Sequence, residues 1–374
     1  MKIGITCYPT YGGSGAVATE LGIALAERGH DVHFITYQAP FRLPSFHPRI
    51  AFHEVGVGHY PLFQYPPYDL ALAVKMHEVA TQQSLDLLHV HYAIPHATSA
   101  WIAKEMLQEQ GKRLPVVTTL HGTDITIVGQ DHSYHAITKF SIERSDRVTA
   151  VSQFLKDETV AAFGCGNSRV DVIPNFVDPA TFDREAFSPE LHTQLGGGRR
   201  VLMHISNFRP VKRVRDVVRI FAKVNAVVPS VLVLVGDGPD RAAAEEEARS
   251  LGVIEYVKCL GKIDGVAPLL AAADLYLIPT DRESFGLSAL EALACGVPVL
   301  GYAVGGLVEV VQHGVTGALR PVGDTDALAA DGIALLEPAR WRTVSAAARA
   351  DARARFTQTE IVARYEALYR EAVA

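Results

Sequence analysis

The chain has 374 residues, of which 48% are hydrophobic, and a formal net charge of −6 at pH 7. This length allows two domains with separate cores, and the mild negative charge argues against nucleic acid or an anionic membrane as a general partner. The four cysteines show no CxxC spacing, and we find no signal peptide and no apolar run of membrane-spanning length. We therefore expect a cytoplasmic protein with reduced thiols.

Short apolar runs alternate with helical patterns along the chain, which predicts an α/β fold with βαβ units and parallel sheets. In the first half the predicted strands begin at Lys2, Asp31, Asp86, Pro115, Arg147 and Val170. In the second half they begin at Arg200, Ser230, Tyr256, Asp274 and Val297. The runs are apolar on both faces, as is typical of parallel strands that are covered by helices on both sides.

A segment rich in proline, glycine and polar residues, 175–199, separates the two halves. We predict an N-terminal domain at 1–174 and a C-terminal domain at 175–359. The last segment, 360–374, has a helical pattern, and we expect it to pack back on the first domain.

A glycine-rich loop follows the first predicted strand and opens a helix, with the sequence Gly12, Gly13, Ser14, Gly15. Glycines at this place let a ligand approach the backbone and leave N–H groups at a helix N-terminus. The full GxGxxG pattern is absent, and no acid stands at 36–38, where the second strand ends, which argues against NAD. A tight strand-to-helix turn is the alternative interpretation.

Two carboxylates flank a predicted helix start late in the chain. Glu283 lies just before the helix, and Glu291 is predicted about two turns inside it. Between them, Gly286, Leu287 and Ser288 leave N–H groups without helical partners, which forms an anion site with an acid on either side. This layout suits a nucleotide-sugar, with the diphosphate at the helix start and hydroxyl groups on the acids.

Other loops in the second half also follow predicted strands. Arg209 offers a planar fork and Lys212 a point charge, and both suit phosphate; a solvated basic loop is the alternative. Gly236 and the segment 261–263 could frame a nucleobase, although glycine-rich turns of this kind are common.

Histidines gather in the first half. His121 follows a buried strand, at the edge where open α/β sheets bind ligands, although a lone histidine is more often a structural hydrogen-bonding group. His89, His91 and His96 invite a metal interpretation, but no acid or cysteine set completes a site, so we expect no metal. Asp324 is predicted to cap a helix.

Together these features resemble the GT-B retaining glycosyltransferases of the GT4 group. The pair Glu283 and Glu291, the pair Arg209 and Lys212, and the GGSG loop occur in the order which that family shows, across essentially the whole chain. One level closer, the stretches ITCYPTYGGSGAVATELG, HFITYQAPFRL, YPPYDLALA, HVHYAIPHA and TTLHGTDIT resemble members that transfer N-acetylglucosamine to L-malate in bacillithiol biosynthesis. The mycothiol-pathway members that use inositol phosphate are less similar.

The resemblance implies a GT-B fold, in which two Rossmann-like domains with parallel sheets face an interdomain cleft. It also implies UDP-N-acetylglucosamine as donor, L-malate as acceptor, no metal or other cofactor, and a homo-oligomer, namely a dimer.

The resemblance also implies roles for individual residues. The catalytic set is His121, Glu283, Arg209 and Lys212. The donor-binding set is Gly13, Gly15, Gly236, Lys262, Ile263, Ser284, Phe285, Gly286, Leu287, Ser288 and Glu291. The acceptor-binding set is Ser14, Tyr92, Thr119 and Lys139. Lys139 stands where the family commonly has arginine, and a lysine gives one charged contact where arginine can give two.

Three alternatives remain open on the sequence. The first is a GT4 enzyme with another acceptor, such as inositol phosphate, a lipid or a glycan. The second is a GT-B epimerase that cleaves the sugar–nucleotide bond without transfer, and the third is a nucleotide-sugar-binding protein without catalysis. Product analysis with and without an acceptor separates them.

Overall fold

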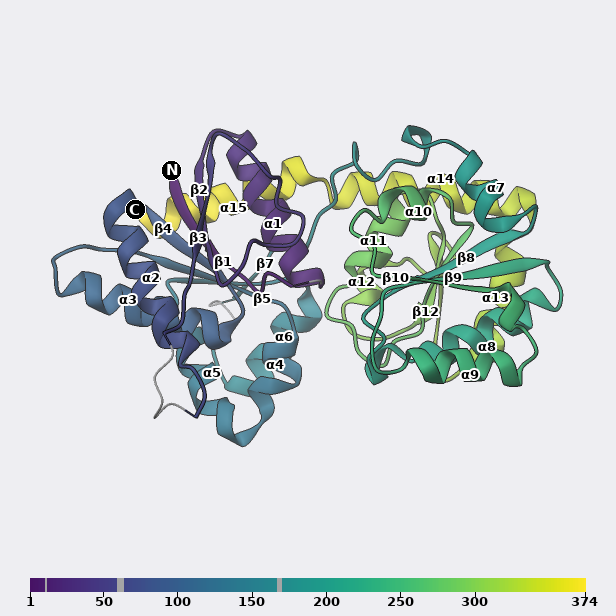
Figure 1. Cartoon of the computed structure of the whole chain (residues 1–374), viewed down its shortest axis with the longest axis horizontal. Coiled ribbons are helices and arrows are strands. Elements are labelled where there is room, and N and C mark those ends of the chain that lie inside the picture. The colour runs from purple at the N-terminus through teal and green to yellow at the C-terminus, as the bar shows by residue number, and fades with distance from the viewer. Residues whose placement is uncertain (11, 59–63, 167–169) are drawn as a thin grey trace. The chain divides into compact units, whose positions relative to one another are not determined.

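The computed structural model describes residues 1–10, 12–58, 64–166 and 170–374, and it divides into two compact units (Figure 1). The first unit comprises Met1–Asn175 and Thr359–Ala374, and the second comprises Phe176–Gln358. The unit boundary therefore lies one residue beyond the predicted boundary at 174/175, and both ends of the chain belong to the first unit.

The first unit is built on a seven-stranded sheet with the order β3-β2-β1-β4-β5-β6-β7, and all the neighbouring strands are parallel. Its strands are β1 (Lys2–Thr6), β2 (Asp31–Thr36), β3 (Ile50–Glu54), β4 (Leu87–His91), β5 (Val116–Leu120), β6 (Arg147–Ala150) and β7 (Val170–Val172). Its helices are α1 (Gly13–Glu27), α2 (Tyr68–Gln83), α3 (Thr98–Gln108), α4 (Thr123–Thr126), α5 (His132–Arg144) and α6 (Gln153–Phe163), joined by α15 (Gln358–Val373).

The second unit is built on a six-stranded parallel sheet with the order β10-β9-β8-β11-β12-β13. Its strands are β8 (Arg200–Ile205), β9 (Ser230–Val235), β10 (Val257–Gly261), β11 (Leu275–Ile278), β12 (Val299–Tyr302) and β13 (Gly317–Arg320). Its helices are α7 (Glu190–Gly196), α8 (Val214–Asn225), α9 (Arg241–Ser250), α10 (Ala267–Ala271), α11 (Leu287–Ala294), α12 (Leu307–Val310), α13 (Thr325–Leu335) and α14 (Pro338–Arg355).

Short helical turns complete both units, and they are η1 (Ala93–Ala97), η2 (Val128–Gln130), η4 (Arg184–Ala186), η5 (Pro210–Lys212) and η6 (Ile254–Tyr256). Strand β9, with the sequence SVLVLV, is buried at every position, because branched side chains fit a sheet that is covered on both faces. Asp324 caps α13 as predicted, its carboxylate accepting from the Ala327 N–H at 3.0 Å. Within the described residues, no helix combines the length and the apolar character needed to cross a membrane.

The structure contains two strands that the sequence interpretation missed, and both lie at the end of a sheet. Strand β3, with the sequence IAFHE, has only three apolar residues, and all five of its residues are at least partly exposed. Strand β13 has four residues, including a glycine and an arginine. An edge strand has a neighbour on one side only, so exposed and polar residues are tolerated there, and the apolar criterion fails.

The C-terminal helix α15 is fastened to the first unit by polar contacts along its length. The Glu366 carboxylate accepts from the Arg28 guanidinium at 2.8 and 3.1 Å and lies 2.9 Å from His30 Nε2. One turn further on, the Tyr369 hydroxyl lies 2.7 Å from His89 Nδ1, inside the core. These contacts explain why the last residues belong to the first unit although the chain reaches them from the second.

We expect Glu366→Gln to destabilise the first unit by about 2 kcal/mol at pH 7, because charge-assisted hydrogen bonds are lost. The Arg28 hydrogen bond lowers the pKa of Glu366 from its ordinary value of 4.5 to about 2. A lowered carboxyl pKa contributes stability that is fully present above pH 4.5 and is lost as the pH falls toward 2. Thermal unfolding of both proteins should therefore differ at pH 7 and converge at acidic pH; an equal difference at both pH values would contradict this account.

Candidate functional site

The candidate donor residues of the second half lie at one edge of one sheet. Strands β10, β9, β8 and β11 are consecutive neighbours, and in a parallel sheet their carboxyl ends meet at the same edge. The loops that follow these four strands carry Lys262 and Ile263, Gly236, Arg209 and Lys212, and the segment from Glu283 to Ser288. The order of the strands reverses between β8 and β11, and such switch points are where open α/β sheets bind ligands.

A cation and a carboxylate meet at this switch point. The Lys212 ammonium donates to Glu283 Oε2 at 2.8 Å, and the two side chains are only 23% and 16% exposed. Arg209 lies on the same loop as Lys212; it is exposed and forms no ion pair with any residue that the structure describes. The structure therefore brings together three of the four predicted catalytic residues at the end of β8 and β11, two of them in direct contact.

The two loops that carry this pair are also joined by their backbones. The Val211 carbonyl accepts from the Thr280 hydroxyl at 2.8 Å and from the Asp281 N–H at 2.9 Å. The Glu283 carbonyl accepts from the Gly306 N–H at 2.8 Å, which ties the second loop to the start of α12. These bonds link the two loops to each other and to α12 in addition to the contact between Lys212 and Glu283.

Helix α11 begins next to this pair. Gly286 precedes it with a positive φ of 97°, and the Gly286 carbonyl accepts from the Leu290 N–H at 3.0 Å. The N–H groups of Leu287, Ser288 and Ala289 come before this bond and therefore have no i→i−4 partner within the helix. Glu291 is 4% exposed and lies one turn inside the helix, not two as the sequence interpretation placed it, because the helix starts only at Leu287. Phe285 is buried, its ring packing edge-on against Phe356.

Gly236 has a packing reason to be glycine. Its φ is +115°, and a Cβ there would stand 1.8 Å from the Ser206 carbonyl oxygen. Its N–H donates to the Gly261 carbonyl at 2.7 Å, which joins the ends of β9 and β10. Lys262 is exposed and Ile263 is half-buried just beyond β10. The tight turn after β9 is therefore sufficient to explain the glycine at position 236. Lys262 and Ile263 lie at the surface, at the edge of the sheet where β10 ends.

In the first unit, the strand order reverses between β1 and β4, and two candidate acceptor residues meet there. Ser14, in the first turn of α1, and Tyr92, directly after β4, are 3.1 Å apart through their hydroxyl groups, with Tyr92 donating. Gly13 is exposed at the start of α1, whereas a Cβ at Gly15 would stand 2.5 Å from the Tyr8 carbonyl oxygen. Gly15 is therefore needed for close packing of the turn.

His121 follows β5, the neighbour of β4, and is held by a second histidine. His121 Nε2 lies 2.8 Å from His91 Nδ1, and the two rings stack with centroids 5.0 Å apart. Desolvation lowers the pKa of His121 to about 3, so its imidazole is neutral at physiological pH. It can therefore accept or donate a hydrogen bond to a ligand, but it does not supply a positive charge.

Asp124 is a residue of this edge to which the sequence interpretation gave no role. It is 2% exposed, and its two carboxylate oxygens accept from the Ala93 N–H at 2.9 Å and the Gly122 N–H at 3.0 Å. Burial raises its pKa to about 6. Because Ala93 and Gly122 directly follow Tyr92 and His121, Asp124 joins the two loops. The signal in the sequence was its place three residues after the strand-end histidine His121, in the motif HGTD.

Two candidate acceptor residues lie elsewhere. The Thr119 side chain is fully buried, and its hydroxyl lies 2.8 Å from His89 Nε2 and 2.7 Å from the Thr149 hydroxyl. It is therefore engaged inside the first unit. Lys139 lies on α5 rather than at a strand end; it is 43% exposed, and its ammonium is 3.9 Å from Glu143.

Each histidine that invited a metal interpretation is hydrogen-bonded within the protein through at least one ring nitrogen, whereas the Nε2 atoms of His91 and His96 are buried without such a partner among the described residues. His89 bridges Tyr369 and Thr119, and His96 Nδ1 lies 2.6 Å from the His91 carbonyl oxygen. Throughout the described part of the chain, no group of three or more His, Cys, Asp or Glu side chains is arranged to hold a metal ion.

Known proteins resemble this chain over its full length. Residues 11–181 match Glycosyltransferase Family 4, and residues 190–354 match Glycosyl transferases group 1. The N-acetyl-alpha-D-glucosaminyl L-malate synthase of Bacillus anthracis is 50% identical over 99% of this chain and 96% of its own. The D-inositol 3-phosphate glycosyltransferase of Thermobispora bispora is 28% identical over 97% of this chain and 90% of its own.

Solved structures agree on the fold. The Anabaena protein HepE, determined with UDP and glucose, superposes with a TM-score of 0.80 at 23% identity, covering 98% of this chain and 99% of its own. Sucrose-phosphate synthase from Thermosynechococcus elongatus gives a TM-score of 0.77 at 24% identity, covering 99% and 98%. The chain therefore belongs to glycosyltransferase family 4 and has the two parallel-sheet, Rossmann-like domains of the GT-B fold.

Proposed function

We propose that this chain is a retaining glycosyltransferase that moves N-acetylglucosamine from UDP-N-acetylglucosamine to the hydroxyl of L-malate, the first step of bacillithiol biosynthesis. The observation that carries the proposal is the 50% identity to the Bacillus anthracis L-malate synthase over 99% of the chain, which includes the half that distinguishes acceptors. The paired Lys212 and Glu283 at the switch point of the second sheet supply the matching chemistry.

The chemistry at the donor centres on the leaving diphosphate, which gains negative charge as the bond to the sugar breaks. Lys212, the exposed Arg209 and the N–H groups at the start of α11 stabilise that charge. In the structure Lys212 is held by Glu283, so a diphosphate that takes up Lys212 releases the Glu283 carboxylate for the sugar hydroxyls. Glu291 holds the ribose hydroxyls.

The acceptor is an L-malate dianion, whose hydroxyl is flanked by two carboxylates. The linked hydroxyl groups of Ser14 and Tyr92 offer hydrogen bonds, and Lys139 offers a positive charge. Desolvation raises the pKa of Tyr92 to about 12, so this hydroxyl stays protonated and remains a donor. Neutral His121 contacts the sugar near the reacting carbon, and an oxygen of the leaving phosphate takes the malate proton.

The test is release of UDP from UDP-N-acetylglucosamine in the presence of L-malate, other hydroxy acids and D-inositol 3-phosphate. The proposal predicts the fastest release with L-malate and little release without an acceptor. Release without any acceptor would indicate an epimerase or hydrolase, faster release with inositol phosphate would indicate another acceptor class, and binding of the donor without release would indicate a non-catalytic protein.

Substitutions of Glu291 and Glu283 are expected to have different effects on the affinity for UDP. Glu291→Gln should weaken UDP about 10-fold or more, because the ribose belongs to UDP and a charged hydrogen-bond acceptor is lost. Glu283→Gln should leave UDP affinity unchanged or increase it, since Lys212 is then freed for phosphate, but it should lower turnover. Calorimetry with UDP alone measures this; equal losses of affinity in both variants would overturn the assignment.

We expect catalysis without a metal ion. Arg209, Lys212 and the N–H groups at the start of α11 stabilise the negative charge of the leaving diphosphate, so the turnover rate should be unchanged in EDTA. Rates measured with and without the chelator test this expectation. Loss of turnover in EDTA with recovery on addition of Mg²⁺ or Mn²⁺ would show that these groups do not suffice.

The proposal also includes a cytoplasmic homodimer. The dimer is carried over from the resemblance to the family. Light scattering coupled to size exclusion measures the oligomer directly, and a mass equal to one chain of 40.5 kDa would contradict the dimer.

A further inference from the structure

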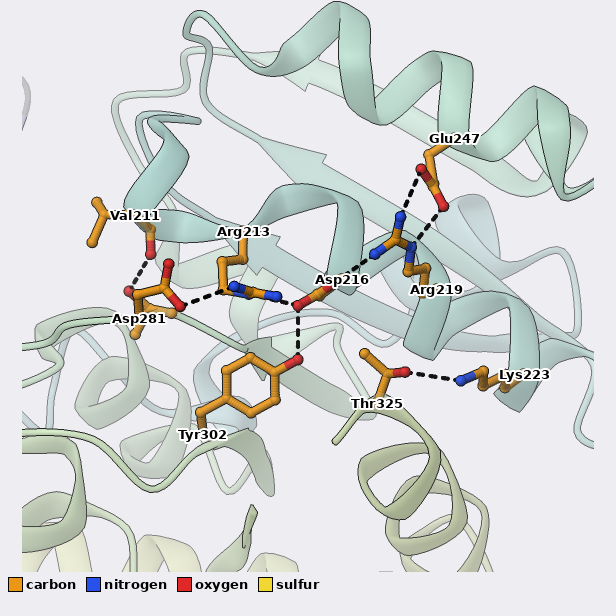
Figure 2. A network of polar contacts seen from close by, with 10 residues as sticks. Val211, Arg213, Asp216, Arg219, Lys223, Glu247, Asp281, Tyr302 and Thr325 are labelled. Atoms are coloured by element: carbon orange, nitrogen blue, oxygen red, sulfur yellow. Dashed lines mark hydrogen bonds and ion pairs between the residues drawn. The ribbon is translucent and has the colours of Figure 1, made fainter. Parts of the chain in front are cut away.

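Figure 2 shows a polar network around Arg213 and Asp216. Arg213 is the neighbour in sequence of Lys212, which pairs with Glu283, and the glycosyltransferase chemistry does not account for the network. Arg213 follows Lys212 in the chain and takes a left-handed conformation with φ 45° and ψ 48°. Its Nε donates to Asp216 at 2.6 Å and its Nη1 donates to Asp281 at 3.1 Å. Arg213 therefore contacts both the first turn of α8 and the loop that carries Glu283.

Asp216 is the buried acceptor at the centre of this network. It is 3% exposed, and beside Arg213 it accepts from the Tyr302 hydroxyl of β12 at 2.8 Å and from Arg219 Nη1 at 3.2 Å. A buried carboxylate is tolerated when hydrogen-bond donors and positive charges surround it, as they do here. The Arg213 guanidinium also lies 5.8 Å from the centre of the Tyr302 ring.

The contacts of this network involve sequence neighbours of both Lys212 and Glu283. On the first loop, Lys212 stands between Val211, whose carbonyl binds Thr280 and Asp281, and Arg213, whose side chain binds Asp281. On the second loop, Glu283 lies two residues after Asp281. Figure 2 shows Arg213 lying between Asp281 and Asp216, with Tyr302 pointing toward Asp216.

We infer that Arg213 is a positioning residue which, anchored on Asp216, holds the Lys212 loop and the Glu283 loop at a fixed separation through Asp281. This inference rests on the proposed role of Lys212 and Glu283. The simpler interpretation is that Arg213 and Asp216 only stabilise the start of α8 as an i,i+3 ion pair. The two interpretations differ in whether the effect reaches Asp281 and the loop beyond it.

Arg213→Gly is a suitable variant, because glycine adopts the left-handed conformation without strain while the side chain is removed. Arg213→Ala removes the same contacts but keeps the Cβ, so agreement between the two excludes added backbone flexibility as the cause. Arg219→Ala is the matched control. Arg219 also binds Asp216, but its other partner is Glu247 on α9, so it does not reach the Glu283 loop.

We expect both Arg213 variants to lower kcat by about 10- to 100-fold with a smaller change in the donor KM, because the reacting groups are displaced rather than removed. Asp281→Asn should give a similar loss, and the double variant Arg213→Gly with Asp281→Asn should be no worse than either alone, since both break one link. Arg219→Ala should keep kcat.

Hydrogen exchange provides a readout that does not need activity. In Arg213→Gly, amides in the segments 206–213 and 280–286 should exchange faster, whereas in Arg219→Ala they should exchange as in the unmodified protein. Unchanged kcat and exchange in the Arg213 variants, or equal effects in Arg219→Ala, would overturn the inference while leaving the proposed function intact. If the unmodified protein shows no transfer, the proposed function fails. The hydrogen-exchange data then test by themselves whether Arg213 holds the Lys212 loop and the Glu283 loop together.

Discussion

Lys212→Ala is expected to reduce turnover by about 100-fold or more, because it removes a positive charge that meets the leaving diphosphate in the transition state. The structure adds a second reason. Lys212 donates to Glu283 at 2.8 Å, so its removal leaves a carboxylate that is only 16% exposed without this partner, next to the expected position of a negatively charged donor. Arg209→Ala should produce a loss of the same order. Steady-state rates with UDP-N-acetylglucosamine and L-malate measure both effects.

Lys223→Ala is the control for the loss of a lysine from the second unit. Lys223 lies on α8 and pairs with Asp326 at 2.6 Å, so its charge belongs to the contact between α8 and α13. It should leave turnover unchanged. Rate constants that stay unchanged in both Arg209→Ala and Lys212→Ala would remove these two residues from the site.

Lys139→Ala is expected to raise the KM for L-malate by about 10-fold or more and to change the donor KM much less, because one charged contact to a carboxylate is lost. Lys139→Arg should retain activity, since a guanidinium keeps the charge and can bind a carboxylate with two hydrogen bonds. In the structure Lys139 is 43% exposed and 3.9 Å from Glu143, a contact loose enough for a ligand to replace. Separate titrations of the two substrates provide the measurement.

Lys75→Ala is a close control for this prediction. Lys75 lies on α2 of the same unit and also pairs with a carboxylate of its own helix, Glu78, at 2.8 Å. Replacing it should leave the L-malate KM as it is. Unchanged malate kinetics in Lys139→Ala would show the acceptor assignment to be wrong, even if transfer of the sugar were observed.

The buried parallel strands could be predicted from sequence because burial on both faces leaves an apolar run. The eleven predicted strands correspond to β1, β2 and β4 to β12, which are all the strands of the two sheets except β3 and β13. These two lie at the ends of their sheets, where a missing neighbour reduces the need for apolar residues. Strands β7 and β10 occupy the other two ends but retain valine residues, so an end position weakens the apolar signal without always removing it.

The donor edge could also be predicted in outline, because each of its loops follows a recognisable strand. The direct contact of Lys212 with Glu283 could not, since it depends on β8 and β11 being neighbours although they are far apart in the chain. The same limit applies to Asp124 and Asp216, whose roles come from bonds to loops or strands that are distant in sequence. For Thr119 the prediction from a strand-end position was misleading. Its position suggested a ligand contact, but its hydroxyl faces His89 in the core.

The most direct test is nuclear magnetic resonance of the product formed from UDP-N-acetylglucosamine and L-malate. The account predicts UDP together with N-acetylglucosamine joined through an α-linkage to the malate hydroxyl, since transfer with retention preserves the configuration of the donor. A β-linked product would contradict retention. Free N-acetylglucosamine without a malate conjugate would contradict the transfer itself.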